Sequence, residues 1–510
     1  MKVRLLHRDR DFDPAAAPPA AAEALTADLG LDILVGAMAG HDRLVWQVSR
    51  AALLAPLSDP DEIRYRQDIL ADALRQPALA RELYALAQAA LESERHVWGY
   101  SSRHPESSLR RSVDVLQAVV GSIRRLRAIA DARVHGVASE GLRRLYSEIA
   151  AELDDTFLGE VDGHIRRLQV GSGVLVSASL GPGNRSADYV FRRRVRKRGW
   201  RERLGLPEPD TYVYQLAPRD EAGARTMGEL RGRGVALAAE ALARSTDHIL
   251  SYFVQLRAEA AFYVGCLNLA EALLRKGEPI CRPEALPREA PALLTRGLYD
   301  VSLSLSMPGR VVGSDIDGDG KALIVVTGAN RGGKSTFLRS LGLAHLMMQS
   351  GMLVAAESFR ADVRPGVFTH FRREEDASLE SGKLDEELSR MSAVVDGLAP
   401  DSIVLMNESF ASTNEREGSE IGRQVTHALL EAGVKVAYVT HLYDLADGFA
   451  REGRADATFL RAERLPDGQR TFRLVEGAPQ PTSHGEDVYR QVFGEGGAIG
   501  WRAPKAVHAG

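Results

Sequence analysis

The residues best suited to do chemistry follow an apolar run at positions 322 to 326 and precede a helical pattern that starts at Phe337. They are mostly small and end in Lys-Ser-Thr: Gly328, Ala329, Asn330, Arg331, Gly332, Gly333, Lys334, Ser335 and Thr336. This spacing, G-x-x-x-x-G-K-[ST] between a strand and a helix, is typical of a loop whose backbone N–H groups surround phosphate oxygens at the positive end of a helix. Lys334 would reach the β- and γ-phosphates, and the Ser335 hydroxyl would hold Mg²⁺. The alternative is an ordinary strand-to-helix turn.

Two further apolar runs end in polar residues that could serve the same site. One run, at positions 403 to 406, lies just before Glu408, and the other, at 434 to 439, lies just before His441. Continuous apolar runs are expected in a parallel sheet covered on both faces, and the carboxyl ends of such strands line the ligand crevice. We therefore expect Glu408 to polarise the attacking water and His441 to contact the γ-phosphate or that water, with Lys334 as the third catalytic residue. Each could instead be an ordinary polar strand end.

Asn407 is unusual for such a site. P-loop enzymes usually hold Mg²⁺ partly through an aspartate at this position, and an amide has no charge to offer. The amide oxygen can still accept a hydrogen bond from a metal-bound water, so we expect Ser335 and Asn407 to hold the metal with reduced affinity. Slow turnover is one expected consequence. The alternative is that asparagine in place of aspartate has no effect on turnover.

The composition is that of a folded cytoplasmic protein with several domains. The chain has 510 residues, 45% of them hydrophobic, and a formal charge of −4, which excludes a uniformly basic nucleic-acid binder. Cys266 and Cys281 form neither a disulfide framework nor a zinc quartet, which suits a reducing cytosol. The charged start is unlike a secretory signal, and no apolar stretch reaches membrane-spanning length, so we expect no membrane partner.

Changes in residue pattern divide the chain into segments. An Ala- and Pro-rich stretch precedes a long region of helical spacing, a β-rich stretch interrupts that spacing, and strand-like runs alternate with helices near the end. We expect a tether at 1–28, a helical core domain at 29–110, lever helices at 111–289 with a β-rich module inserted at about 171–221, an α/β nucleotide-binding domain at 290–495 and a flexible tail at 496–510.

The prediction of lever helices with a β-rich tip depends on one long stretch of helical spacing. Helical spacing from 235 to 276 predicts a rod of roughly 60 Å that stops at Gly277. A plain helical bundle with a surface hairpin is the alternative.

The β-rich module contains a strongly basic stretch, in which eight of the twelve residues from 192 to 203 are Lys or Arg and one is Trp. Such a cluster is an electrostatic footprint for phosphates, although phosphate contacts specify no base sequence. The alternatives are a solvated loop and a site for an acidic protein or lipid. The predicted DNA-binding residues are Arg192, Arg193, Arg194, Arg196, Lys197, Arg198 and Arg201.

Together these motifs resemble those of the MutS mismatch-repair ATPases. The likeness is specific in the ATPase half, looser before it, and spans roughly residues 50 to 495. It is carried by the loop at 327–339, a segment at 351–358 that resembles the family's strand after the first helix, the strand end and signature loop at 407–418, the Thr-His element at 440–445, and upstream segments at 312–316 and 56–67.

The resemblance implies an ABC-type homodimer that binds ATP and Mg²⁺. Each nucleotide would be closed by the other subunit's signature loop, here through Ser412 and Thr413, which could alternatively cap a helix. Closing the dimer would move the levers, and in the family the corresponding tip is a DNA clamp.

Several features depart from the family pattern. The signature loop lacks the usual glycines. We expect neither the mismatch-reading and connector domains, for which there is no room before residue 50, nor a carboxy-terminal nuclease module. The resemblance is therefore to a trimmed member that is not a mismatch sensor.

Two functions remain open. The first is a dimeric, ATP-driven clamp on double-stranded or branched DNA, acting in repair or recombination. The second is a nucleotide-gated scaffold with weak ATPase activity that holds protein or RNA. A transporter ATPase is less favoured, because that class needs a glycine-rich signature and a membrane partner.

Overall fold

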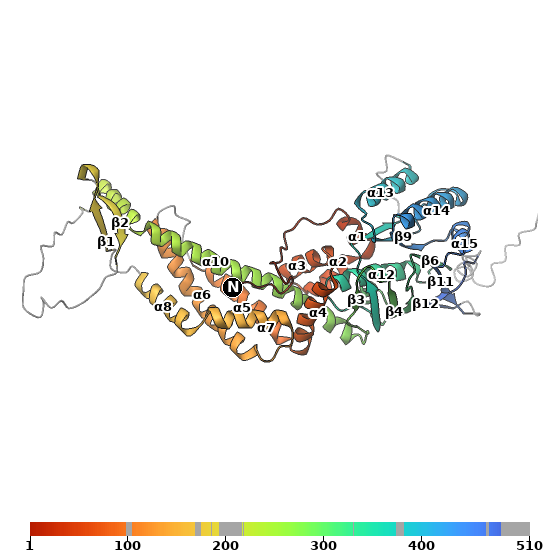
Figure 1. Cartoon of the computed structure of the whole chain (residues 1–510), viewed down its shortest axis with the longest axis horizontal. Helices are drawn as coiled ribbons and strands as arrows, with labels where there is room; N and C mark the ends of the chain where they lie inside the picture. Colours follow the sequence, from red (N-terminus) through yellow and green to blue (C-terminus); the bar gives the residue numbers. More distant parts are fainter. Residues whose placement is uncertain are drawn as a thin grey trace, which may run out of the picture. The chain divides into compact units, whose positions relative to one another are not determined.

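The structure is a computed structural model that describes residues 1–97, 105–168, 175–184, 186–192, 217, 219–329, 331–373, 382–465 and 469–480. The chain forms two units, and helix α10 contributes to both (Figure 1). One unit comprises Met1–Phe12 and Ala78–Ala260, and the other comprises Asp13–Pro77 and Ala261–Gly510.

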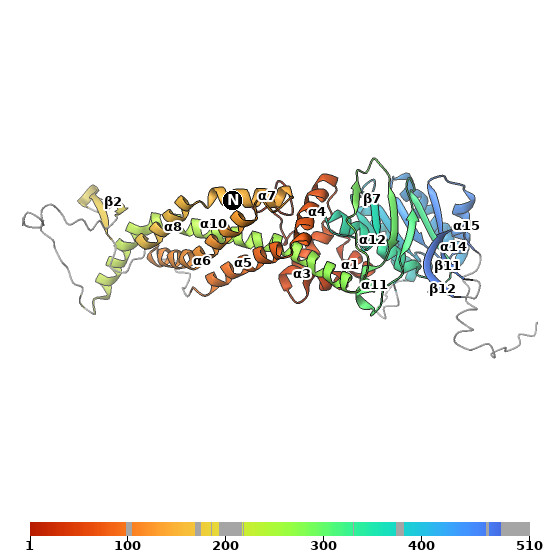
Figure 2. The same cartoon turned by 90° about the horizontal axis from the view of Figure 1, so that it is seen from below.

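The first unit is a set of long helices, several of which lie side by side in both Figure 1 and Figure 2. Apolar residues at helical spacing join them: Val113 and Leu116 of α6 pack with Ile165 of α8 and Ile249 of α10. The helix predicted at 235–276 begins earlier, at Glu221, and ends as expected just before Gly277, which has a φ of 69°. The helices of this unit are α5 (Ala78–Arg95), α6 (Pro105–Arg133), α7 (Glu140–Glu152), α8 (Asp155–Leu168) and α10 (Glu221–Arg275).

A β-hairpin is attached to α10 in the first unit. Strands β1 (Val176–Leu180) and β2 (Ser186–Phe191) pair antiparallel on either side of a short 3₁₀ turn (Pro182–Asn184). Val176 packs so closely on Gly234 of α10 that a Cβ there would lie 2.4 Å from a methyl group of Val176. The β-rich module predicted at about 171–221 thus contains a hairpin, and its residues 193–216 lie outside the described residues.

The start of the chain differs from the predicted tether over 1–28. Val3, Leu5 and Leu6 are buried in the first unit. Their backbone is held by the buried carboxylate of Glu259 on α10, which accepts hydrogen bonds from the N–H groups of Leu6 at 3.0 Å and Phe12 at 3.2 Å, and from that of Leu5. Residues 1–12 are thus part of a packed core, and residues 22–29 form a helix of the second unit.

The predicted core domain at 29–110 is also divided differently, because its first helices pack on the α/β part of the second unit. Gln349 on α12 donates to the carbonyl of Leu57 at 2.9 Å, and Ser350 donates to that of Ala52 at 3.1 Å. Asp59 caps α4 and Pro60 occupies its first position. The helices concerned are α1 (Ala22–Leu29), α2 (Leu31–Ala39), α3 (Arg43–Leu54) and α4 (Pro60–Arg75).

A six-stranded sheet with the order β12-β11-β6-β10-β9-β8 lies at the centre of the α/β part. All neighbouring pairs are parallel except β11 and β12. The predicted runs form β6, β9 and β10, whose residues are almost completely buried. The strands are β6 (Leu323–Thr327), β8 (Val367–Phe371), β9 (Ile403–Asn407), β10 (Lys435–Val439), β11 (Ala457–Arg464) and β12 (Arg470–Glu476).

Helices and a second sheet complete this part. Side chains of α13, α14 and α15 join one apolar cluster with β6, β9 and β10. In the segment 351–358, which resembles a strand of the family, Val354 forms an isolated bridge with Cys281 and a continuous strand begins only at Ser358. The second sheet contains β3 (Glu284–Leu286), β7 (Ser358–Asp362), β4 (Leu293–Leu298) and β5 (Ser314–Asp317) in that order, and the helices are α11 (Val301–Ser306), α12 (Lys334–Gln349), α13 (Lys383–Gly397), α14 (Glu415–Glu431) and α15 (Tyr443–Arg451).

Candidate nucleotide site

The glycine-rich loop connects β6 to α12, as the sequence predicted. Gly328 and Gly333 have φ values of 110° and 90°, a region that favours glycine. A Cβ on Gly332 would lie 2.6 Å from the Cβ of Ala462 on β11, so the loop is pressed against the neighbouring strand. Arg331 is exposed with a φ of 59°, Ala329 is buried, and Asn330 lies outside the described residues. The loop therefore leads directly to the N-terminal end of α12, where unpaired N–H groups favour an anion.

Lys334 is the first residue of α12 and lies over this loop. Its buried Nζ donates to the carbonyl oxygens of Gly328 at 2.9 Å and Ala329 at 3.1 Å. Burial lowers the pKa of the Lys334 amine, Arg470 adds to this effect, and the carboxylate of Glu408 opposes it. The ammonium group thus lies between the loop and Glu408, where it could meet a phosphate.

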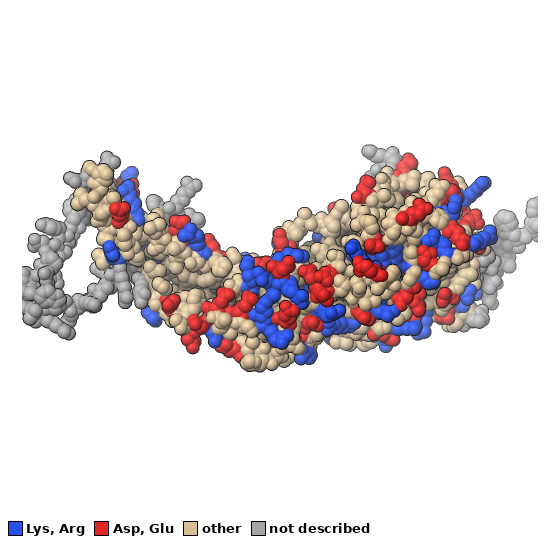
Figure 3. All heavy atoms as spheres, in the orientation of Figure 1, with Lys and Arg blue, Asp and Glu red and all other residues tan. Residues whose placement is uncertain are grey.

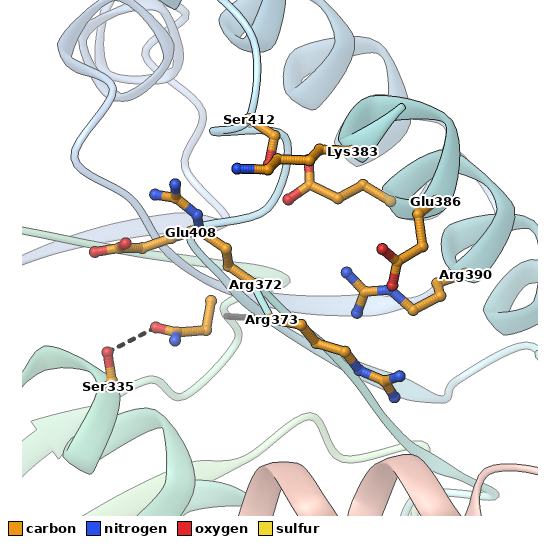
Figure 4. A pocket seen from close by; sticks show the side chains of 10 residues that line it. Ser335, Arg372, Arg373, Lys383, Glu386, Arg390, Glu408 and Ser412 are labelled. Carbon is orange, nitrogen blue, oxygen red and sulfur yellow. Dashed lines mark hydrogen bonds and ion pairs between the residues drawn. The ribbon is translucent and has the colours of Figure 1, made fainter. Parts of the chain in front are cut away.

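The side chains of Ser335 and Asn407 are in direct contact. The Ser335 hydroxyl donates to Oδ1 of Asn407 at 2.8 Å, which joins the start of α12 to the end of β9 (Figure 4). Both side chains offer oxygen atoms, the ligand type that Mg²⁺ prefers, but neither carries a charge. The pair fits Mg²⁺ by ligand type, with the negative charge left to the phosphates of a nucleotide. Thr336, one residue further, is a half-buried residue of α12.

Glu408 follows Asn407 in a strained backbone conformation. Its φ is 53°, and its N–H donates to the carbonyl of Val439 at the end of β10 at 2.8 Å. A left-handed conformation in a non-glycine residue costs about 1 to 3 kcal/mol and is common at functional sites. The hydrogen bond to β10 holds the residue in this conformation, beside the segment that carries His441.

His441 and Glu408 form an electrostatic pair. His441 Nδ1 lies 3.7 Å from Glu408 Oε1, beyond normal hydrogen-bond length, so the contact is ionic when the ring is protonated. His441, followed by Lys334 and Arg372, lowers the pKa of the Glu408 carboxyl against the opposing effect of burial. Glu408 is therefore a carboxylate at neutral pH, able to accept a hydrogen bond from water.

Ser412 and Thr413 both interact with residues of their own chain. Thr413 donates to Glu417, and Asn414 caps α14 by accepting from the N–H of Glu417 at 3.0 Å. Ser412 is close to Glu387, whose pKa is raised by burial and lowered in part by Ser412. The helix cap is thus Asn414, and a role for Ser412 and Thr413 across a subunit interface stays a prediction.

Four of these residues line one cavity of about 680 Å³ (Figure 4), whereas Lys334, His441 and Thr413 are not among its lining residues. It is a size suited to a nucleotide or other small ligand. Its lining combines four residues singled out from the sequence with six that were not: Ser335, Asn407, Glu408 and Ser412, together with Arg372, Arg373, Lys383, Glu386, Glu387 and Arg390. The pattern that singled out Glu408 does not mark Arg372 and Arg373, because the strand before them contains Thr369 and His370 and is not a continuous apolar run.

A buried histidine supports the cavity wall. His370 Nδ1 lies 2.7 Å from Ser409 Oγ, and its Nε2 lies 3.0 Å from the carbonyl oxygen of Glu387. Burial lowers the His370 pKa to about 4, so the ring is neutral at physiological pH. It joins β8 to α13 and to the residue after Glu408, which fixes three walls of the cavity relative to one another.

Two sequence models of protein families match this chain. The model described as the MutS2 N-terminal domain matches residues 58–276, and the model described as MutS domain V matches residues 324–493. The second match covers the loop, Glu408, His441 and the six-stranded sheet. The chain belongs to the MutS family.

Relatives in the MutS family match over parts of their length. The protein called Endonuclease MutS2 of Lacticaseibacillus casei is 30% identical over 245 residues, which are 47% of this chain and 30% of that protein. Endonuclease MutS2 of Thermus thermophilus is 34% identical over 158 residues, 31% of this chain and 21% of that protein. The DNA mismatch repair protein MutS 2 of Haloarcula marismortui is 31% identical over 168 residues, 32% and 18% respectively. The matching region thus spans less than a third of each relative.

Most of the predicted DNA-binding residues of this MutS-family chain lie outside the described residues. Arg192 is described: it ends the hairpin, and its Nε donates to Ser177 Oγ at 2.9 Å. On the face drawn in Figure 3, acidic and basic side chains are interspersed, in keeping with the small net charge. Among the described helices, none is long and apolar enough to cross a membrane. The other predicted DNA-binding residues all lie outside the described part of the chain: Arg193, Arg194, Arg196, Lys197, Arg198 and Arg201.

Proposed function

We propose that this MutS-family chain binds and hydrolyses ATP, and that the nucleotide closes a homodimer that grips double-stranded or branched DNA during repair or recombination. The observation that carries the ATPase part is the convergence of Lys334, Ser335, Asn407, Glu408 and His441 on one edge of the six-stranded sheet. The names of two relatives, Endonuclease MutS2 and DNA mismatch repair protein MutS 2, support the DNA part.

In this proposal each residue of the site has a step in the reaction. Lys334 binds the β- and γ-phosphates, while Ser335 and Asn407 would hold the metal, which would neutralise phosphate charge when bound. Glu408 accepts a hydrogen bond from a water, and the water oxygen attacks the γ-phosphorus as the bond to the bridging oxygen breaks. The proton of the water passes to Glu408, and ADP leaves with the electron pair of the broken bond. His441 stabilises the Glu408 carboxylate and contacts the water or the γ-phosphate. In the dimer, Ser412 and Thr413 of one copy would close the nucleotide of the other.

The ATPase rate of the purified chain, measured with and without duplex, branched and single-stranded DNA, tests turnover and coupling together. We expect hydrolysis that Glu408→Gln abolishes, and duplex binding that changes with ATP at moderate salt. Duplex binding that is indifferent to ATP would exclude the clamp.

The basic stretch has its own test. Replacing Arg192, Arg193, Arg194 and Arg196 together should flatten the salt dependence of DNA binding, because fewer counterions are released. The affinity for ATP should stay unchanged. Unchanged DNA binding would place the footprint elsewhere.

A second function is favoured by the neutral Asn407. A nucleotide-gated scaffold would bind ATP, hydrolyse it slowly and use its helices to hold protein or RNA. Slow turnover that Asn407→Asp raises several-fold supports the scaffold. Rapid wild-type turnover that duplex DNA stimulates excludes it.

A further inference from the structure

The charge around the predicted metal position is unusual for a phosphate loop. Asn407 faces Ser335 through a neutral amide oxygen, 2.8 Å from the hydroxyl. In most P-loop sites a carboxylate here attracts the divalent cation, which in turn neutralises the phosphates. With an amide, the protein attracts the cation less, and a bound triphosphate needs positive charge from another source.

Arg372 is placed where that charge is needed. Phe371 and Asn407 are paired on the parallel strands β8 and β9, so Arg372 leaves the sheet at the same edge as Glu408. Its N–H donates to the carbonyl of Asn407 at 2.9 Å, which fixes its backbone beside the metal position. Its side chain lines the cavity and points toward Glu408 in Figure 4, close enough for an electrostatic interaction.

The other two arginines of the cavity are oriented differently. Arg390 donates to the carbonyl of Phe371 at 2.8 Å, and its Nε lies 3.5 Å from Glu386. Arg373 points to the opposite side of the cavity from Glu408 in Figure 4, and it interacts with the half-buried Asp28 of α1. Of the three guanidinium groups, that of Arg372 faces the catalytic residues.

We propose that Arg372 binds the terminal phosphate of the nucleotide held by its own chain, and so replaces part of the charge that a metal ion supplies in other P-loop sites. This inference rests on the proposed nucleotide site. A guanidinium can donate two hydrogen bonds to one phosphate, and its charge does not depend on a bound ion. ATP affinity should therefore depend only weakly on Mg²⁺, and Arg372 should carry the metal-independent part.

Equilibrium binding of a fluorescent ATP analogue to the full chain tests this inference, in Mg²⁺ and in excess EDTA. We expect the wild type to lose less than about tenfold in affinity without Mg²⁺, and Arg372→Ala to lose about 10- to 100-fold more in EDTA, the range of a charge-assisted hydrogen bond. Asn407→Asp should make binding strongly Mg²⁺-dependent. Arg423→Ala, an exposed arginine on α14 paired with Glu420, controls for loss of a surface charge.

The outcomes separate this inference from the proposed function. If Lys334→Ala abolishes binding while Arg372→Ala binds like the wild type in EDTA, the role of Arg372 is wrong and the nucleotide site stands. Equal losses in Arg372→Ala and Arg373→Ala would also overturn it, because they would indicate general charge rather than position. If the wild type binds no analogue in either buffer, the proposed nucleotide site itself fails.

Discussion

Replacing Lys435 by Met should stabilise the α/β part of the protein. Lys435 begins β10, the strand between the phosphate-loop strand and the Glu408 strand, and is 2% exposed. Its Nζ has no hydrogen-bond partner among the described residues. Burial, aided by the nearby Arg364, lowers the pKa of the amine from 10.5 to about 8, whereas Asp362 and Asp319 oppose the shift. Such a shift corresponds to about 3 kcal/mol against the charged folded state.

The pH dependence follows from the direction of this shift. Below about pH 8 the amine is protonated in both states, and the full penalty applies. Between about pH 8 and 10.5 the folded state loses its proton first, so the contribution of Lys435 to stability rises with pH. Lys435→Met should therefore raise the free energy of unfolding by about 3 kcal/mol at pH 7, and the gain should shrink as the pH approaches 10.5.

Hydrogen exchange of the β9 and β10 amides, together with urea unfolding, measures this difference. Lys321→Met is the matched control, because that amine makes a surface hydrogen bond to the carbonyl of Ala455. It should change stability by less than about 1 kcal/mol, with no such pH profile. A Lys435→Met protein no more stable than the wild type at pH 7, or equally stabilised at pH 7 and 10, would refute the reasoning.

Two further substitutions test contacts that organise each unit. Glu259→Ala removes a carboxylate that binds the backbone of the first twelve residues, so the amides of Leu5 and Phe12 should lose protection in hydrogen exchange. The free energy of unfolding should fall by at least about 3 kcal/mol. Glu240→Ala, on the exposed face of α10, is the control and should leave these amides protected. Gly351→Ala places a Cβ 2.5 Å from that of Arg66 and should cost clearly more in urea unfolding than Gly433→Ala. Both glycines have nearly the same φ, 77° and 76°, but Gly433 has open space around it, so equal costs would contradict the predicted clash.

The strands of the central sheet could be predicted because their patterns are local. Three largely apolar runs became β6, β9 and β10, since a strand covered on both faces favours apolar residues at most positions, and Lys435 is the exception inside β10. The same reasoning placed Glu408 and His441 at one edge, and the structure brings them together. Their catalytic roles stay predictions.

The features that were missed depend on distant partners. Residues 1–12 look like a charged tether, and contacts with distant residues such as Glu259 and Arg144 make their apolar residues part of a core. The first four helices belong with the α/β part because of contacts such as that between Gln349 and Leu57. The basic wall of the cavity comes from α13 and from the residues that follow β8. No sequence motif records that β8 pairs with the strand that ends in Asn407.

Sedimentation of the Glu408→Gln protein with saturating ATP tests most directly whether nucleotide held by the phosphate loop lies between two copies of the chain. The account predicts a dimer, because bound ATP is not consumed and both sites stay closed. Adding Lys334→Ala should return the protein to a monomer, since the loop then loses its main cation. A Glu408→Gln protein that remains monomeric at saturating ATP would contradict the account.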